Sequence, residues 1–154
     1  MNSNTKENRF VGIEGFVHVA SPIGGISDVN EAISITVKAG LNGLKACAKV
    51  PSCKGFVFTS SSLAATFPHP NVEFSIDENT YNDEALRILE KEPGKPGLFV
   101  YAAMKTETEK AMMKWMEENQ PSFVLNRIVS RKSNALERPL LTPNSCRTPI
   151  LALS

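Results

Sequence analysis

The sequence has almost no excess of charge of either sign and no long hydrophobic run. Of its 154 residues, 17 are Lys or Arg and 16 are Asp or Glu, which gives a net charge of +1. A nearly neutral chain lacks the basic field that attracts nucleic acid or an anionic membrane surface. No segment reaches the about 18 consecutive apolar residues that a membrane helix needs. We therefore expect a small-molecule ligand, and neither a nucleic acid nor a membrane as partner.

Cysteine is scarce as well. Cys47, Cys53 and Cys146 are odd in number and have no metal-ligand spacing, so we expect reduced thiols of an intracellular protein and no metal site. Residues 1–8 are polar and lack the apolar core of a signal peptide. These features predict a cytoplasmic protein.

Three short apolar runs are candidates for buried strands. They cover residues 16–20, 56–59 and 123–129, and the first ends at Ser21-Pro22. Hydrophobic residues make up 42% of the chain, which is typical of a globular domain. Strands that are apolar on both sides are typical of a parallel sheet that is buried on both faces.

Helical periodicity separates these runs. Asp28 is a candidate cap for a helix that ends near Lys49, and apolar residues recur at helical spacing between them. Further helices are expected over residues 83–91 and 100–119. The order β-α-β-α-β predicts an α/β fold, a parallel sheet with helices on its faces.

The last part of the chain changes in character. Residues 130–154 contain three prolines, several Ser and Arg, and no sustained periodicity. We therefore expect one folded domain over residues 1–129 and an irregular tail over residues 130–154.

One pair of residues on the third expected helix suggests chemistry. Tyr101 and Lys105 are four residues apart, so their side chains share a helix face. A tyrosine is a poor acid or base at neutral pH, and a nearby ammonium group lowers its pKa and makes proton transfer to a carbonyl oxygen feasible. The spacing alone is common by chance, and its plain alternative is an exposed helix pair.

A run of hydroxyl side chains strengthens this hypothesis. Residues 59–62 read Thr-Ser-Ser-Ser where the second expected strand ends. Ligands of open parallel sheets bind outside the carboxyl ends of the strands. A serine there is placed to donate a hydrogen bond to the same carbonyl oxygen.

Four motifs occur in order: FVHVASP at residues 16–22, FVFTSS at 56–61, IDE at 76–78 and YAAMK at 101–105. Together they resemble the extended short-chain dehydrogenases/reductases (the NAD-dependent epimerase/dehydratase family). Within that family they are most similar to fungal aldehyde/carbonyl reductases and dihydroflavonol 4-reductase-like proteins. The resemblance covers residues 10–126 and implies a Rossmann-like sheet.

The resemblance also implies roles for individual residues. Tyr101 would protonate the carbonyl oxygen of an aldehyde or ketone, Lys105 would lower its pKa and hold the nicotinamide ribose, and Ser61 would polarise the carbonyl. The backbone of Ala20, Ser21 and Pro22 would line the cofactor, NADP or else NAD. This turn, Tyr101 and Lys105 form the expected cofactor-binding set.

The sequence departs from the family pattern at both ends. Only 15 residues precede Phe16, whereas the family opens with a glycine-rich strand-turn-helix, and a βαβ unit needs about 30 residues. The resemblance also stops after Asn126. We therefore expect a truncated chain with a partial Rossmann-like sheet that lacks the first βαβ units. Such a chain should bind the cofactor weakly and should not turn over a carbonyl substrate.

Three alternatives accompany the reductase hypothesis. In the first, the chain is an inactive remnant. In the second, it is an interaction-only pseudoenzyme that self-associates through exposed helix or sheet surfaces. The third alternative is a nucleotide-sugar epimerase or dehydratase. Two further residues have plain interpretations. We expect His18 to be a packed core histidine and Asn42 to face solvent or to have a capping role, rather than to take part in catalysis.

Overall fold

A computed structural model describes residues 12–22, 28–92, 94–95 and 97–129. Residues 130–154, the expected tail, and Cys146 lie outside this range. In chain order the elements are β1 (Gly15–His18), α1 (Val29–Ala48), β2 (Gly55–Ser60), the 3-10 helix η2 (Ser62–Ala64), α2 (Asp83–Lys91), α3 (Gly97–Asn119) and β3 (Val124–Val129).

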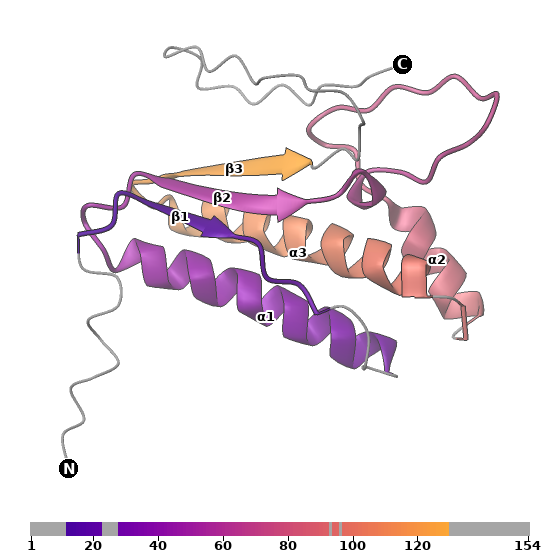
Figure 1. The fold of residues 1–154 in the computed structure, drawn as a ribbon, viewed down its shortest axis with the longest axis horizontal. Helices are drawn as coiled ribbons and strands as arrows, with labels where there is room; N and C mark the ends of the chain where they lie inside the picture. The colour runs from indigo at the N-terminus through magenta and orange to yellow at the C-terminus, as the bar shows by residue number, and fades with distance from the viewer. Residues whose placement is uncertain (1–11, 23–27, 93, 96, 130–154) are drawn as a thin grey trace.

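The three strands form one parallel sheet in the order β1-β2-β3. Phe56 of the central strand is aligned with Phe16 of β1 and with Leu125 of β3. The carboxyl ends of the strands therefore meet at one edge of the sheet, as Figure 1 shows. The predicted α/β fold with a parallel sheet is confirmed.

The helices α1 and α3 lie along the same face of this sheet (Figure 1). The sequence pattern predicted helices on the faces of the sheet, and within the described residues α1 and α3 both cover the same face (Figure 1). A β-α-β crossover is right-handed in nearly all proteins. Because the strand order runs steadily from β1 to β3, two such crossovers place their helices on the same side.

The face covered by helices carries the aromatic residues. In β2, Phe56, Phe58 and Ser60 are buried, and the residues between them point to the other face and are only half-buried. On that uncovered face, the exposed fractions are 61% for Val17 and 51% for Ile128. The apolar character of the uncovered face is the reason why the strands looked buried on both sides in the sequence.

Two apolar clusters hold the helices in place. The first fills the space between the sheet, α1 and α3, and its buried members are Leu44, Cys47, Cys53, Phe56, Phe58, Met112 and Phe123. The second lies where α2 packs on α3, and its buried members are Phe67, Ala85, Leu89, Ala102 and Ala103. The helix α3 contributes residues to both clusters, so it is the main support for the side chains at the end of β2.

The helix ends follow the local sequence. Asp28 caps α1 by accepting a hydrogen bond from the Glu31 amide at 2.9 Å, as its position predicted. Asn82 caps α2 by accepting from the Ala85 amide at 3.2 Å. The helix α3 begins at Gly97, three residues earlier than the periodicity indicated. None of the helices in the described ranges combines the length and hydropathy needed to cross a membrane.

Candidate active site

Lys105 lies at the carboxyl end of the central strand. Its Nζ donates a hydrogen bond to the Thr59 carbonyl oxygen at 2.8 Å, and it is 5.7 Å from the centre of the Tyr101 ring. The same nitrogen lies 4.9 Å from the centre of the Phe58 ring. Aromatic faces attract cations, so these contacts orient the ammonium group between the helix and the strand end.

The environment of Lys105 is unusual for a lysine. Its side chain is only 3% exposed, and this burial lowers its pKa from the ordinary value because water no longer solvates the charge. The Glu109 carboxylate, one helical turn further along α3, acts in the opposite direction on the Lys105 pKa. A lysine with a lowered pKa in a polar site is a candidate for a role in proton transfer.

The three serines after Thr59 have different environments. Ser60 is buried, and its hydroxyl donates a hydrogen bond to the Glu109 carboxylate. Ser61 is half-buried and extended, and its oxygen accepts a hydrogen bond from the Leu63 amide at 3.3 Å as the cap of η2. Ser62 is exposed. Because the Ser61 oxygen is the acceptor in that contact, the Ser61 proton remains free to point at a ligand.

The expected cofactor segment follows β1 at the same edge of the sheet. Ala20 is exposed, whereas Ser21 and Pro22 are half-buried. The Ser21 Oγ atom is buried and has no hydrogen-bond partner among the described residues. A buried hydroxyl without a partner is costly, so this position suits a polar ligand group.

His18 and Asn42 lie in the surroundings that the sequence predicted. His18 is buried, and its ring lies 5.7 Å from that of Phe58 and 6.2 Å from that of Phe56. Burial lowers the pKa of His18, with a smaller contribution from the nearby Lys105 charge. Asn42 is exposed on α1.

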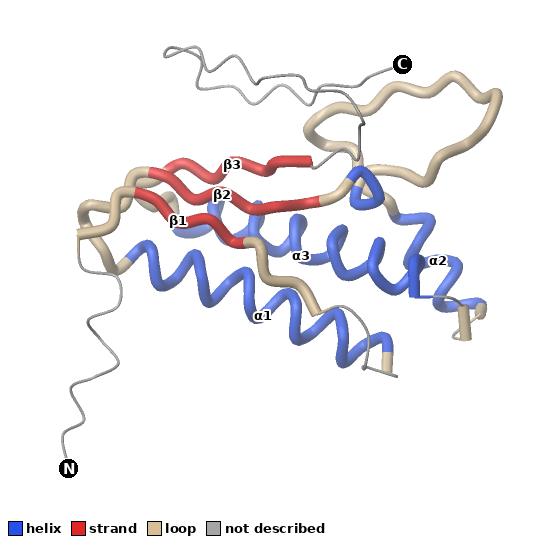
Figure 2. The backbone as a smooth tube through the Cα atoms, viewed as in Figure 1, coloured by secondary structure: helices blue, strands red, loops and turns tan. Residues whose placement is uncertain are grey.

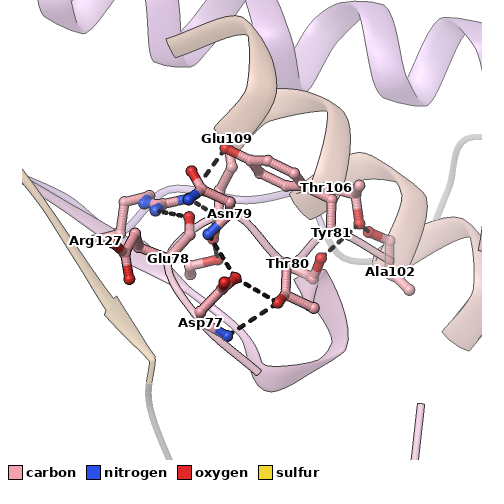
Figure 3. Close-up of polar contacts among 11 residues, drawn as sticks. Asp77, Glu78, Asn79, Thr80, Tyr81, Ala102, Thr106, Glu109 and Arg127 are labelled. Carbon is pink, nitrogen blue, oxygen red and sulfur yellow. Dashed lines mark hydrogen bonds and ion pairs between the residues drawn. The ribbon is translucent and has the colours of Figure 1, made fainter. Parts of the chain in front are cut away.

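A buried ion pair next to the site was not anticipated from the sequence. Arg127 of β3 donates from Nη1 to Glu109 Oε2 at 2.9 Å and from Nη2 to the Glu78 carbonyl oxygen at 2.6 Å (Figure 3). The Tyr81 hydroxyl also accepts from Arg127 Nη1, at 3.4 Å. The only hint in the sequence was the spacing of four residues from Lys105 to Glu109, which places both on one helix face.

A shallow hollow of about 310 Å³ lies beside this ion pair. Its walls come from the long loop between η2 and α2, which Figure 2 shows, and from the first residues of α2. Tyr81 contributes to both the hollow and the Arg127 contacts. The described ranges contain no cluster of three or more His, Cys, Asp or Glu side chains that suits a metal ion.

The described residues thus form part of a Rossmann-type parallel sheet with a Tyr-Lys pair at its carboxyl edge, where sheets of this kind bind their ligands. The chain is 42% identical over 123 residues to aldehyde reductase 2 of Sporidiobolus salmonicolor, covering 77% of this chain and 36% of that protein. It is 37% identical over 120 residues to an NAD-dependent epimerase/dehydratase of Aspergillus terreus, covering 76% of this chain and 35% of that protein. No family model matches the chain.

Solved structures of reductases have the same fold over the matched part. The vestitone reductase of alfalfa superposes with a TM-score of 0.59 at 30% identity, over 77% of this chain and 35% of that one. The yeast methylglyoxal/isovaleraldehyde reductase solved with NADPH has a TM-score of 0.64 at 23% identity, over 76% and 35%. The resemblance to short-chain dehydrogenase/reductase-type reductases is therefore confirmed over the matched part of this chain. It spans about a third of the length of the curated relatives that it matches.

Proposed function

We propose that this chain carries the proton-transfer site of an NADPH-dependent reductase of an aldehyde or ketone, with Ser61, Tyr101 and Lys105 as its catalytic residues. The observation that carries the proposal is the position of Lys105. Its buried ammonium is 5.7 Å from the centre of the Tyr101 ring and is hydrogen-bonded to the strand end that leads into Ser61. The homology to reductases supports the same assignment.

Tyr101 and Ser61 would act on the carbonyl oxygen of the substrate, and Lys105 would act on Tyr101. The nicotinamide ring, when bound, supplies a hydride to the carbonyl carbon. Tyr101 gives its phenolic proton to the oxygen as negative charge develops there, which yields the alcohol. The Lys105 ammonium favours the resulting phenolate, and the Ser61 hydroxyl donates a hydrogen bond to the oxygen.

The cofactor would lie across the carboxyl edge of the sheet. We propose that Ala20, Ser21 and Pro22 line its nicotinamide half together with Tyr101 and Lys105. The unsatisfied Ser21 hydroxyl supports this placement, because it lies in the turn that follows β1. NADPH is the donor that we propose, with NADH as the alternative.

The test is a chimera in which residues 12–129 of this chain replace the equivalent third of aldehyde reductase 2 of Sporidiobolus salmonicolor. We expect NADPH oxidation with an aromatic aldehyde, and a loss of at least about 100-fold in kcat for Tyr101→Phe, the usual contribution of a general acid. Lys105→Met and Ser61→Ala should also lower kcat. Lys114→Met is the control for Lys105→Met, because the Lys114 side chain lies on the same helix and is 76% exposed.

Three outcomes would count against the proposal. A chimera that turns over equally well with phenylalanine at position 101 would remove Tyr101 from the mechanism. A folded chimera that binds NADPH and does not reduce carbonyls would favour an inactive remnant. Conversion of nucleotide sugars in place of aldehydes would favour the epimerase/dehydratase alternative. The 37% identical relative from Aspergillus terreus is the reason to test it.

We also propose a cytoplasmic location and self-association of the 154-residue chain. Val17, Val124 and Ile128 expose apolar surface on the uncovered face of the sheet, and this surface supports self-association. Sedimentation of the wild type and of Val17→Lys would test it. We expect the substitution to shift the chain towards the monomer.

A further inference from the structure

The end of β2 is bound to α3 at two consecutive residues. The Thr59 carbonyl oxygen accepts from Lys105, and the Ser60 hydroxyl donates to Glu109. Lys105 and Glu109 are four residues apart on the helix, so they bind the strand end from successive turns. Two contacts of this kind fix both the distance and the lengthwise position of a strand relative to a helix.

The Glu109 carboxylate needs a partner to remain in this position. The residue is only 6% exposed, and a buried carboxylate is costly unless it is paired and hydrogen-bonded. Arg127 supplies the pair, and its own side chain is 14% exposed. The guanidinium also donates to the Glu78 carbonyl oxygen, so its orientation is fixed from a second side.

The Glu109–Arg127 pair therefore connects four segments around the site, and Figure 3 shows its contacts with the loop that carries Glu78. Glu109 lies on α3, Arg127 on β3, Ser60 at the end of β2, and Glu78 on the η2–α2 loop. A helix rises by about 1.5 Å per residue, so a slip of β2 along α3 by one residue would move Ser61 by more than an ångström relative to Tyr101. A misplacement of about 1 Å can cost 100-fold in rate.

We propose that Glu109 and Arg127 are positioning residues that fix Ser61 against Tyr101 and Lys105. The inference rests on the proposed function for its consequence in catalysis, and on the contacts of this chain for its structural part. Neither residue touches the reacting atoms. Their role is to hold the end of β2 in place through the Ser60 hydroxyl.

Amide hydrogen exchange of the full 154-residue chain tests the structural part. Arg127→Met leaves the Glu109 charge buried without its partner, so we expect amides at residues 61–65 to exchange at least about tenfold faster relative to those of α1. The double variant Glu109→Gln/Arg127→Met removes the unpaired charge and keeps an oxygen for Ser60. This double variant should recover most of the protection at residues 61–65. It therefore also tests the proposal if the single variant fails to fold.

Lys114→Met is the matched control. Lys114 lies on the same helix, its side chain is 76% exposed, and it pairs with Glu118. We expect it to leave exchange at residues 61–65 unchanged relative to α1. Equal acceleration throughout the chain in Arg127→Met would show a role in general stability only and would overturn the proposal, as would an unchanged rate at residues 61–65.

The catalytic part is measured in the chimera described above. Arg127→Met should lower kcat at least about tenfold with little change in the KM for NADPH, because positioning acts on the reacting geometry. Arg127→Lys keeps the charge and should lose less. An inactive wild-type chimera would count against the proposed function alone, because the exchange experiment decides the structural inference independently. A fully active Arg127→Met chimera would overturn the positioning role.

Discussion

Lys105 and Thr59, 46 residues apart in the chain, are joined by a hydrogen bond of 2.8 Å from an ammonium group to a backbone carbonyl oxygen. A backbone acceptor cannot be altered by substitution of its own side chain, so this contact is insensitive to the residue at position 59. The contact therefore depends on the lysine side chain at position 105. This relationship makes Lys105 the residue whose replacement separates stability from chemistry most clearly.

Lys105→Met should leave the free energy of unfolding unchanged or raise it at neutral pH. Burial lowers the Lys105 pKa, which means that the folded state binds the lysine proton less tightly than the unfolded state does. The charge therefore opposes folding, and an apolar side chain of similar length removes that cost. Urea denaturation of both chains measures the difference.

The lowered pKa of Lys105 also makes the free energy of unfolding depend on pH. With a lowered folded pKa, the wild type gains stability as the pH rises through the folded pKa of Lys105 towards 10.5, and the advantage of Lys105→Met should shrink over that range. Lys114→Met, at a side chain that is 76% exposed, is the control and should change stability by less than about 0.5 kcal/mol. A clearly less stable Lys105→Met chain would disprove this account.

Acidification below neutral pH should destabilise the chain through His18. Burial lowers the His18 pKa below 6.5, so the unfolded state binds more protons and stability falls as the pH drops through 6.5 towards the folded pKa. The difference in unfolding free energy between pH 7 and pH 5 should be smaller in His18→Leu. His69→Leu is the control, because His69 is partly exposed beside Glu84. An identical pH slope in wild type and His18→Leu would contradict the prediction.

Cys47 should resist thiol reagents while the chain is folded. Burial and a hydrogen bond with Cys53 raise the pKa of the Cys47 thiol to about 12, and the thiolate is the reactive form. Iodoacetamide at pH 8 should modify Cys47 and Cys53 in a Cys146→Ser background only after urea is added, as mass spectrometry would show. The stability of the fold should also decrease as the pH rises above 9, where the unfolded thiol ionises and the folded one does not. Rapid labelling under native conditions would refute the buried arrangement.

Gly40→Ala should destabilise the chain, whereas Gly55→Ala should be tolerated. A Cβ atom at Gly40 of α1 would lie 3.0 Å from Met112 Sδ and from Thr108 Cγ2 of α3, which is closer than side chains normally approach. Alanine improves helix propensity by about 1 kcal/mol, but overpacking costs about 1–3 kcal/mol, so a net loss is expected. At Gly55 a Cβ would meet nothing within 4 Å. Thermal unfolding of both variants decides the matter, and a Gly40→Ala chain more stable than the wild type would show that Met112 moves aside freely.

The sequence predicted the elements that depend on local signals. Asp28 begins α1, and α2 spans the residues that the pattern indicated, because both caps are short polar side chains next to amphipathic periodicity. The start of α3 was placed too late, because nothing in residues 97–99 resembles a cap.

The site was predictable only in part, for a physical reason. Tyr101 and Lys105 share a helix turn, so their proximity follows from spacing. The partnership of Glu109 with Ser60 and Arg127 depends on how α3 docks on the sheet, and a glutamate in a helix is ordinarily read as solvated. Local patterns contain no information about which distant charge will neutralise it.

The contacts that hold the end of β2 also bear on how the chain reaches its folded state. Thr59 and Ser60 bind residues 46 and 49 positions later in the sequence. Contacts between distant residues carry a loop-closure cost and form slowly. During synthesis the strand end leaves the ribosome well before α3 and Arg127 exist to receive it. Until then, the Ser60 hydroxyl and the Thr59 carbonyl oxygen bind water in place of Glu109 and Lys105. The carboxyl edge of the sheet is therefore completed among the last steps of folding.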